Sequence, residues 1–158
     1  MKYKAAVLTV SDKASIGERE DKSGPAIKEI LEQKDFEVVF YKVVPDEVEE
    51  IKSKLKLWAE EVDLVLTTGG TGLSKRDVTP EATLAVIERY IPGFSDAIRQ
   101  KSLDITPHSM LSRAVSGTLG KTLIINLPGS QKAVKQSLDI VMPAVPHAID
   151  ILNGKTEH

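Results

Sequence analysis

The sequence contains no cysteine among its 158 residues. Disulfide bonds, a thiolate nucleophile and zinc sites built from cysteine are therefore excluded. The three histidines, His108, His147 and His158, lie far apart in the sequence and form no pair at the spacing that binds zinc on a helix. We therefore do not expect a structural zinc site.

Basic runs and long apolar stretches are also missing. The chain has 21 Lys and Arg against 23 Asp and Glu, and without a basic cluster we expect no nucleic-acid partner and no anionic membrane surface. Apolar stretches such as residues 123–127 have the length of a strand, far below the roughly 20 residues of a membrane span. The first residues are too polar for a signal peptide. We therefore expect a cytoplasmic protein that does not bind membranes.

Strand-like and helix-like segments alternate along the chain. The apolar runs at residues 4–10, 37–44, 63–68 and 121–127 are typical of buried strands. Expected helix caps follow at Ser23, Asp46 and Thr79, the last one just before Pro80. The alternation predicts one domain over residues 1–158. We expect a three-layer, doubly wound α/β fold with a mostly parallel sheet and helices on both faces.

Residues 67–72 (TTGGTG) directly follow the third expected strand. Ligands of an open parallel sheet bind beyond the carboxyl ends of its strands. Glycines let the backbone approach a ligand closely, and successive bare N–H groups can form an anion-binding concavity. The segment therefore predicts a phosphate-binding loop, with a tight strand-to-loop turn as the alternative.

Arg76 and Asp77 lie between this loop and the expected helix start at Thr79. The helix start does not need them. Arginine is suited to phosphate oxygens and aspartate to Mg²⁺, so the pair favours a nucleotide and metal site. A surface salt bridge is the alternative interpretation.

A second loop, residues 126–130 (NLPGS), follows the last expected strand. Ser130 is an expected helix cap, and the helix N-terminus offers amides to a second anionic group. An ordinary strand–turn–helix junction is an equally good interpretation. By contrast, residues 117–122 (GTLGKT) look like the end of a P-loop but lead into a strand and have Val115 where that motif needs glycine. They predict a hairpin or turn.

Together these motifs resemble the MogA/MoaB family, which includes the G domains of plant Cnx proteins and gephyrin. The resemblance is carried by TTGGTG at 67–72, RDVTPEAT at 76–83, PGF at 92–94, LSR at 111–113 and NLPGS at 126–130. It extends from VSD at 10–12 and SGP at 23–25 over nearly the whole chain. Residues 101–117 are closer to the MogA branch than to the MoaB branch.

The resemblance implies a homotrimer that transfers the adenylyl group of Mg-ATP to molybdopterin and releases pyrophosphate, with a molybdate insertase as a further partner. It implies that Asp46 and Asp77 are the catalytic carboxylates and hold Mg²⁺. The implied nucleotide-binding residues are Gly69, Gly70, Thr71, Gly72 and Arg76, and the implied molybdopterin-binding residues are Ser102, Ser112, Asn126, Pro128, Gly129 and Ser130. The family often has Asn at the position of Ser130, and some members have Asp or Asn at the position of Glu47.

Two alternatives remain beside this function. One is a MoaB-like member of the family, and the other is a non-catalytic scaffold that binds the pterin. Asp46 and Asp77 favour the enzyme, because a pure binding protein does not need metal-holding carboxylates. Adenylyl transfer also requires no covalent nucleophile, which agrees with a chain without cysteine.

Overall fold

The computed structural model describes residues 3–155, and within them a six-stranded sheet with the order β2-β1-β3-β6-β5-β4 forms the centre of the molecule. Strands β1 (Tyr3–Val10), β2 (Phe36–Val44), β3 (Leu64–Thr68) and β6 (Thr122–Leu127) are parallel. Strands β4 (Arg89–Tyr90) and β5 (Ser116–Leu119) complete the sheet in antiparallel pairing. The four expected strands are confirmed, and so is the expected mostly parallel sheet.

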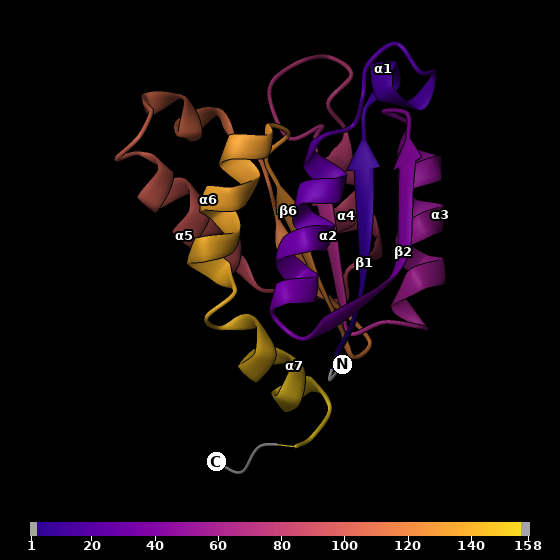
Figure 1. The fold of residues 1–158 in the computed structure, drawn as a ribbon, viewed down its shortest axis with the longest axis vertical. Helices are drawn as coiled ribbons and strands as arrows, with labels where there is room; N and C mark the ends of the chain where they lie inside the picture. The colour runs from indigo at the N-terminus through magenta and orange to yellow at the C-terminus, as the bar shows by residue number, and fades with distance from the viewer. Residues whose placement is uncertain (1–2, 156–158) are drawn as a thin grey trace.

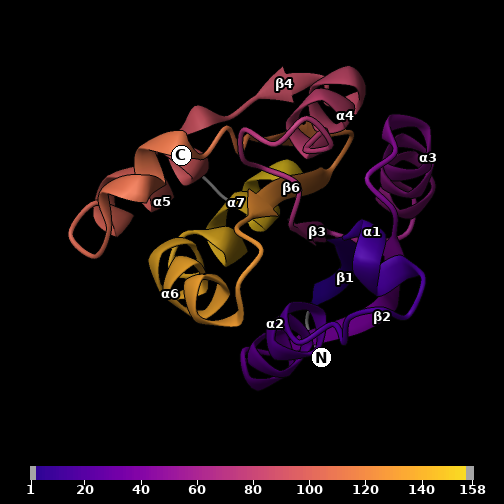
Figure 2. The same cartoon turned by 90° about the horizontal axis from the view of Figure 1, so that it is seen from above.

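Helices cover both faces of the sheet, as Figure 2 shows from above. Helices α2 (Ser23–Gln33), α5 (Pro92–Ser102), α6 (Gln131–Val141) and α7 (Val145–Leu152) share one apolar core with the strands. Helices α3 (Val48–Ala59) and α4 (Thr79–Val86) form the core on the opposite face. Every residue of β3 and β6 is buried, because strands in the middle of a covered parallel sheet have no solvent-facing side. The three-layer α/β fold is confirmed.

The segment predicted to be a hairpin or turn joins β5 to β6. Leu119 pairs with Thr122 across it. Gly120 has φ +59, a backbone conformation that favours glycine. The prediction against a P-loop is therefore confirmed, since this segment leads from one antiparallel strand into the next.

Asp46 and Thr79 are not the helix caps that the sequence predicted. Helix α3 has Glu47 at its N-cap, while the Asp46 carboxylate accepts a hydrogen bond from the N–H of Asp12 at 2.8 Å. The Thr79 hydroxyl donates to the carbonyl of Gly69 at 3.0 Å. Both side chains make contacts between loops that are distant in sequence, which local capping patterns do not describe.

Of the two serines predicted to be helix caps, Ser130 is one and Ser23 is not. The Ser130 hydroxyl caps α6 by accepting from the N–H of Ala133 at 3.1 Å, as expected. Ser23 is the first residue of α2, and its hydroxyl donates to the carbonyl of Gly129 at 2.6 Å. The contact joins the start of α2 to the start of α6.

The carboxyl ends of the four parallel strands lie at one edge of the sheet, at the top of Figure 1. A short helix, α1 (Asp12–Ser15), lies there as well. The 3-10 helix η1 (Pro107–Leu111) follows α5. Across residues 3–155, the structure has no helix with the length and apolar character needed to cross a membrane.

Candidate active site

Two cavities lie at the carboxyl edge of the sheet. The first, called here the polar cavity, has a volume of about 820 Å³ and is enclosed by the loop between β1 and α2, by Asp46 and Asp77, and by residues 68–70 and 129–131. The second, called here the α5 cavity, has a volume of about 270 Å³ and lies between α5, η1, the start of α6 and the glycine loop. Both are at the edge where ligands of parallel sheets bind.

The structure divides the predicted site residues between these cavities. The polar cavity is lined by Asp46, Gly69, Gly70, Asp77, Gly129 and Ser130. The α5 cavity is lined by Thr71, Gly72, Ser102, Ser112 and Pro128. Arg76 and Asn126 line neither of them.

The two cavities share a wall made from the ends of β3 and β6. Gly70 and Thr71 are consecutive residues on opposite sides of it, and so are Pro128 and Gly129. The Thr68 hydroxyl donates to the Pro128 carbonyl at 2.6 Å. A backbone hydrogen bond also joins the two halves of the wall, from the N–H of Gly69 to the carbonyl of Leu127 at 3.3 Å.

The glycines of this wall are required by the fold as well as by a ligand. Gly69 and Gly70 have φ values of +96 and +69. A Cβ atom on Gly69 would lie 2.3 Å from the carbonyl oxygen of Val10. One on Gly70 would lie 2.4 Å from the Thr79 hydroxyl and 3.1 Å from the Asp46 carboxylate. The tight-turn interpretation is therefore correct, and it leaves the backbone bare where it faces the polar cavity.

Asp46 is held by a reciprocal pair of hydrogen bonds with Asp12. The N–H of Asp12 donates to Asp46 Oδ2 at 2.8 Å, and the N–H of Asp46 donates to Asp12 Oδ1 at 2.9 Å. Burial raises the pKa of Asp46, and the negative charges of Asp12 and Asp77 raise it further, while the hydrogen bond from Asp12 lowers it. The Asp46 carboxylate is therefore half-buried and close to other negative charges, so a bound cation would stabilise its ionised form.

Arg76 binds Asp12 and Glu47 instead of facing a cavity. Its Nε lies 3.0 Å from Asp12 Oδ2, and its Nη2 lies 3.0 Å from Asp12 Oδ1 and from Glu47 Oε1. These hydrogen bonds, together with the bond from the Asp46 N–H, lower the pKa of Asp12. The salt-bridge interpretation of Arg76 is thus the one that the structure bears out. The guanidinium joins the loops that follow β1, β2 and β3.

Asp77 is positioned by Arg113, a residue that the sequence analysis named only as part of the LSR motif. The guanidinium of Arg113 donates to the carbonyls of Gly72 and Asp77, each at 2.8 Å, and forms an ion pair with Glu81. Its own N–H donates to the carbonyl of Thr71 at 2.8 Å. Arg113 therefore holds both ends of the segment from Gly72 to Asp77, and this segment carries Asp77 to the polar cavity.

Asn126 lies in the core and lines neither cavity. Its side-chain NH₂ donates to the hydroxyls of Thr67 and Thr83, each at 3.0 Å, and its oxygen accepts from the N–H of Val115 at 3.1 Å. The residue has no exposed surface. Its amide fixes β6 against β3, α4 and the start of β5, since a buried amide needs such partners.

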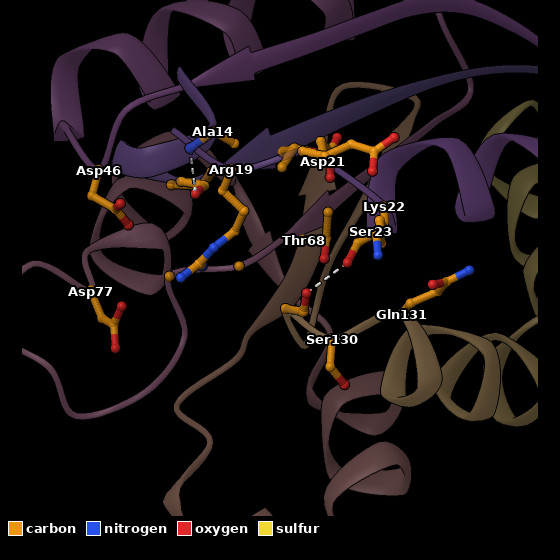
Figure 3. Close-up of a pocket in the computed structure, with 17 residues that line it drawn as sticks. Ala14, Arg19, Asp21, Lys22, Ser23, Asp46, Thr68, Asp77, Ser130 and Gln131 are labelled. Carbon is orange, nitrogen blue, oxygen red and sulfur yellow. Dashed lines mark hydrogen bonds between the residues drawn. The ribbon is translucent and has the colours of Figure 1, made fainter. Parts of the chain in front are cut away.

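The sequence named no individual site residue in the loop between β1 and α2, although this loop lines the polar cavity (Figure 3). Asp21 accepts hydrogen bonds from the Thr9 hydroxyl at 2.7 Å and from the Tyr41 hydroxyl. Burial raises the pKa of Tyr41, and the hydrogen bond to Asp21 raises it further, so Tyr41 remains a donor. Arg19 and Lys22 of the same loop also line the polar cavity. The VSD and SGP motifs that bracket this loop were the available signal.

The carboxylates of the polar cavity fit a hard cation that is held mainly by its substrate. Within residues 3–155, no group of three or more His, Cys, Asp and Glu side chains has the arrangement of a metal site. Asp46 and Asp77 both line the cavity, and the negative charge of Asp77 is felt at Asp46. Mg²⁺ typically binds through one or two carboxylates together with substrate phosphates and water. The pair therefore suits Mg²⁺ bound with a nucleotide.

Comparisons with known proteins identify the family of this chain. Residues 6–147 match the model of a family described as the probable molybdopterin binding domain. The chain belongs to this family, which is the one that the TTGGTG and RDVTPEAT motifs resemble.

Relatives and solved structures of the family carry several names. The chain is 45% identical over 152 residues to the molybdopterin adenylyltransferase of Helicobacter pylori, covering 94% of this chain and 86% of that protein. It is 46% identical over 160 residues to gephyrin of Dictyostelium discoideum, but these span 94% of this chain and only 22% of gephyrin. The crystal structure of the molybdopterin biosynthesis enzyme MoaB from Thermus thermophilus has a TM-score of 0.91 and 48% identity, covering 97% of this chain and 98% of that one. The MogA and MoaB branches are not separated by these values, so the closeness to MogA stays a prediction.

Proposed function

We propose that this chain catalyses the adenylylation of molybdopterin with Mg-ATP, releasing pyrophosphate. Family membership, together with relatives named molybdopterin adenylyltransferase, supports an enzyme of molybdenum cofactor biosynthesis. The use of ATP and Mg²⁺ is the part of the proposal that rests on the site.

The observation that carries the proposal is the shared wall of the two cavities. Group transfer between two bound molecules requires that their reacting atoms meet in a fixed geometry. Here the glycine loop and residues 128–129 face one cavity on each side. A ligand in the α5 cavity that extends an anionic group past Pro128 therefore meets a ligand of the polar cavity at this wall.

We assign ATP to the polar cavity and molybdopterin to the α5 cavity. The polar cavity offers the bare backbone of Gly69 and Gly70 and the capped N-terminus of α6 at Ser130, features that favour phosphate groups. The α5 cavity offers the hydroxyls of Ser102 and Ser112 among aliphatic side chains such as Ile98. Such a mixture suits a flat ring system with polar edges.

The reaction is an in-line displacement. An oxygen of the terminal phosphate of molybdopterin forms a bond to the α-phosphorus of ATP, and the bond from that phosphorus to the oxygen bridging to the β-phosphorus breaks. Asp46 and Asp77 would hold Mg²⁺, which neutralises phosphate charge when bound. Asp12 and Arg113 keep these two carboxylates in place. In the glycine loop, the N–H of Gly69 is bonded to Leu127, so the N–H of Gly70 is the one that would contribute a fixed hydrogen-bond donor to the phosphates.

Two further elements of the proposal, a homotrimer and a molybdate insertase as partner, rest on the family resemblance alone. A cytoplasmic location is proposed from the composition of the sequence. Analytical ultracentrifugation would test the homotrimer directly.

The test of the function is release of pyrophosphate from ATP when Mg²⁺ and molybdopterin are both present. We expect release that requires all three components, together with formation of adenylylated molybdopterin. Binding of molybdopterin without any pyrophosphate release would instead establish the non-catalytic scaffold.

A further inference from the structure

Two basic side chains of the loop between β1 and α2 are exposed to the polar cavity. Arg19 and Lys22 line it together with Ser23 and Ser130. Figure 3 shows Arg19 reaching into the cavity toward the side where Asp46 and Asp77 lie, and Lys22 beside Ser23 on the other side. The sequence patterns did not single out either of them.

Arg19 and Lys22 differ from Arg76, Arg99 and Arg113, whose side chains are bonded to other residues of the protein. Arg76 binds Asp12 and Glu47, Arg113 binds two carbonyls and Glu81, and Arg99 binds Asp96 and the Ala114 carbonyl. Arg19 and Lys22 form no ion pair and no side-chain hydrogen bond with any residue in the range 3–155. Their charge is therefore available to a ligand of the cavity.

The cavity also contains the acidic residues Glu20, Asp21, Asp46 and Asp77, so a bare anion needs both these cations and other donors. Helices α2 and α6, each of 11 residues, begin at Ser23 and Gln131 at this cavity, and the bare backbone of Gly69 and Gly70 faces it as well. Helix N-termini and unpaired basic side chains together favour phosphate groups. An anion of a single charge would not need this many donors, whereas a polyphosphate chain would.

We propose that Arg19 and Lys22 bind the β- and γ-phosphates of ATP and retain the pyrophosphate as it leaves, an inference that rests on the function proposed above. When the α-phosphorus is transferred, the electron pair of the breaking bond stays on the oxygen of the leaving pyrophosphate. Cations already placed there stabilise the charge that develops. The phosphate-binding role that the sequence suggested for Arg76 belongs to these two residues, since Arg76 is held by Asp12 and Glu47.

The experiment is a calorimetric titration of the full chain with pyrophosphate, ATP, AMP and molybdopterin, each with Mg²⁺ present. The variants are Arg19→Gln, Lys22→Gln and the double substitution. Lys28→Gln is the control, because Lys28 is an exposed lysine of α2 that does not line the cavity. Thermal melting of every variant checks that the fold is retained.

Each single variant is expected to bind pyrophosphate and ATP about 10-fold more weakly, and the double variant about 100-fold more weakly, as for lost charge-assisted hydrogen bonds. AMP and molybdopterin should bind as in the parent. Arg19→Lys should recover part of the loss, and Lys28→Gln should show none.

Parent-like pyrophosphate binding by the double variant would overturn the assignment. So would a loss of molybdopterin affinity in place of pyrophosphate affinity, because the two side chains would then contact the phosphate of the other substrate. Failure of the proposed function has a different signature. If the variants lose pyrophosphate binding but the parent forms no adenylylated molybdopterin, the phosphate site stands and the reaction does not.

Discussion

The two cavities are built from the same wall but in different ways. In the polar cavity, two carboxylates are held through backbone hydrogen bonds. The Asp46 carboxylate accepts from the N–H of Asp12, and the guanidinium of Arg113 donates to the backbone carbonyl of Asp77. In the α5 cavity, hydroxyls such as those of Ser102 and Ser112 lie among aliphatic side chains. The difference indicates that the position and charge of side chains matter most in the polar cavity, and that the shape of the cavity matters most in the α5 cavity.

The largest effect is expected on the charged side, from Asp46→Asn. This change keeps the size of the side chain and an oxygen that can accept from the Asp12 N–H. Turnover should fall about 10²- to 10³-fold, as when a charge-stabilising group of an active site is removed. Binding of molybdopterin should survive. Single-turnover transfer of AMP and equilibrium titration of the pterin measure the two quantities separately.

The same variant also tests the direction of the Asp46 pKa. Because burial raises this pKa in the folded state, the ionised carboxylate opposes folding at any pH above that raised value, and the opposition vanishes below the unfolded value. At pH 7 the melting temperature of Asp46→Asn should therefore equal or exceed that of the parent. A lower melting temperature together with unchanged turnover would leave Asp46 with a structural role only.

Next in size is the effect of loosening Asp77 through Arg113→Lys. Lysine keeps the charge but cannot donate to the carbonyls of Gly72 and Asp77 at once. We expect kcat to fall by about 10-fold or more with little change in the KM for molybdopterin, because small displacements of catalytic groups are costly.

Arg99→Lys is the matched comparison on the other side of the wall. Arg99 and Ala114 both line the α5 cavity, and the Arg99 guanidinium donates to the Ala114 carbonyl at 2.7 Å. Its loss should raise the KM for molybdopterin more than it lowers kcat. If Arg113→Lys and Arg99→Lys changed kcat and KM in the same way, the two cavities would not have the separate roles proposed here.

A smaller effect is expected from Ser102→Ala in the α5 cavity. If its hydroxyl contacts the pterin, affinity should drop by about 1–3 kcal/mol, the cost of a lost hydrogen bond in a buried site, while the rate from the bound complex stays near the parent value. Ser109→Ala is the control, since the Ser109 hydroxyl already donates to the Arg99 carbonyl at 3.0 Å. Fluorescence titration of the pterin would measure both, and identical losses would remove the special role of Ser102.

The smallest effect concerns Asp12→Asn and depends on pH. The hydrogen bonds from Arg76 lower the pKa of Asp12 in the folded state. The resulting stabilisation is fully present above the unfolded value of about 3.9 and is lost as the pH falls through the folded value. The variant should melt about 1–3 °C below the parent at pH 7, and the difference should shrink toward pH 3, since this pair is exposed to solvent. Melts at four pH values suffice, and a difference that grew in acid would refute the assignment.

Sequence patterns predicted those parts of the molecule that are decided locally. The apolar runs gave the four parallel strands, and TTGGTG was correctly placed at the end of β3. The errors arose where a polar side chain bonds to a residue distant in sequence. Asp46, Thr79 and Ser23 have the residue types of helix caps, yet they bind Asp12, Gly69 and Gly129.

Arg76 and Asn126 show the same limit within the candidate site. Each has side-chain chemistry that suits a ligand, and each is instead used by the fold, Arg76 by the loop after β1 and Asn126 by neighbouring threonines. Arg19 is the opposite case. It lies in a polar loop with no motif, and only the three-dimensional arrangement brings it to the cavity.

The wall between the cavities also sets the length that a ligand of the α5 cavity needs in order to reach the polar cavity. Its halves are the ends of the neighbouring strands β3 and β6, and neighbouring strands lie about 4.8 Å apart. The bonds that join them end on the backbone carbonyls of Leu127 and Pro128, so a change of rotamer at those positions does not move the wall. A molecule in the α5 cavity therefore reaches the polar cavity only if the arm that carries its anionic group is long enough to pass Pro128. If the α5 cavity holds molybdopterin as proposed, analogues with the correct ring and a shorter arm would bind there without reacting, and the chain would select its substrate by reach as well as by ring chemistry.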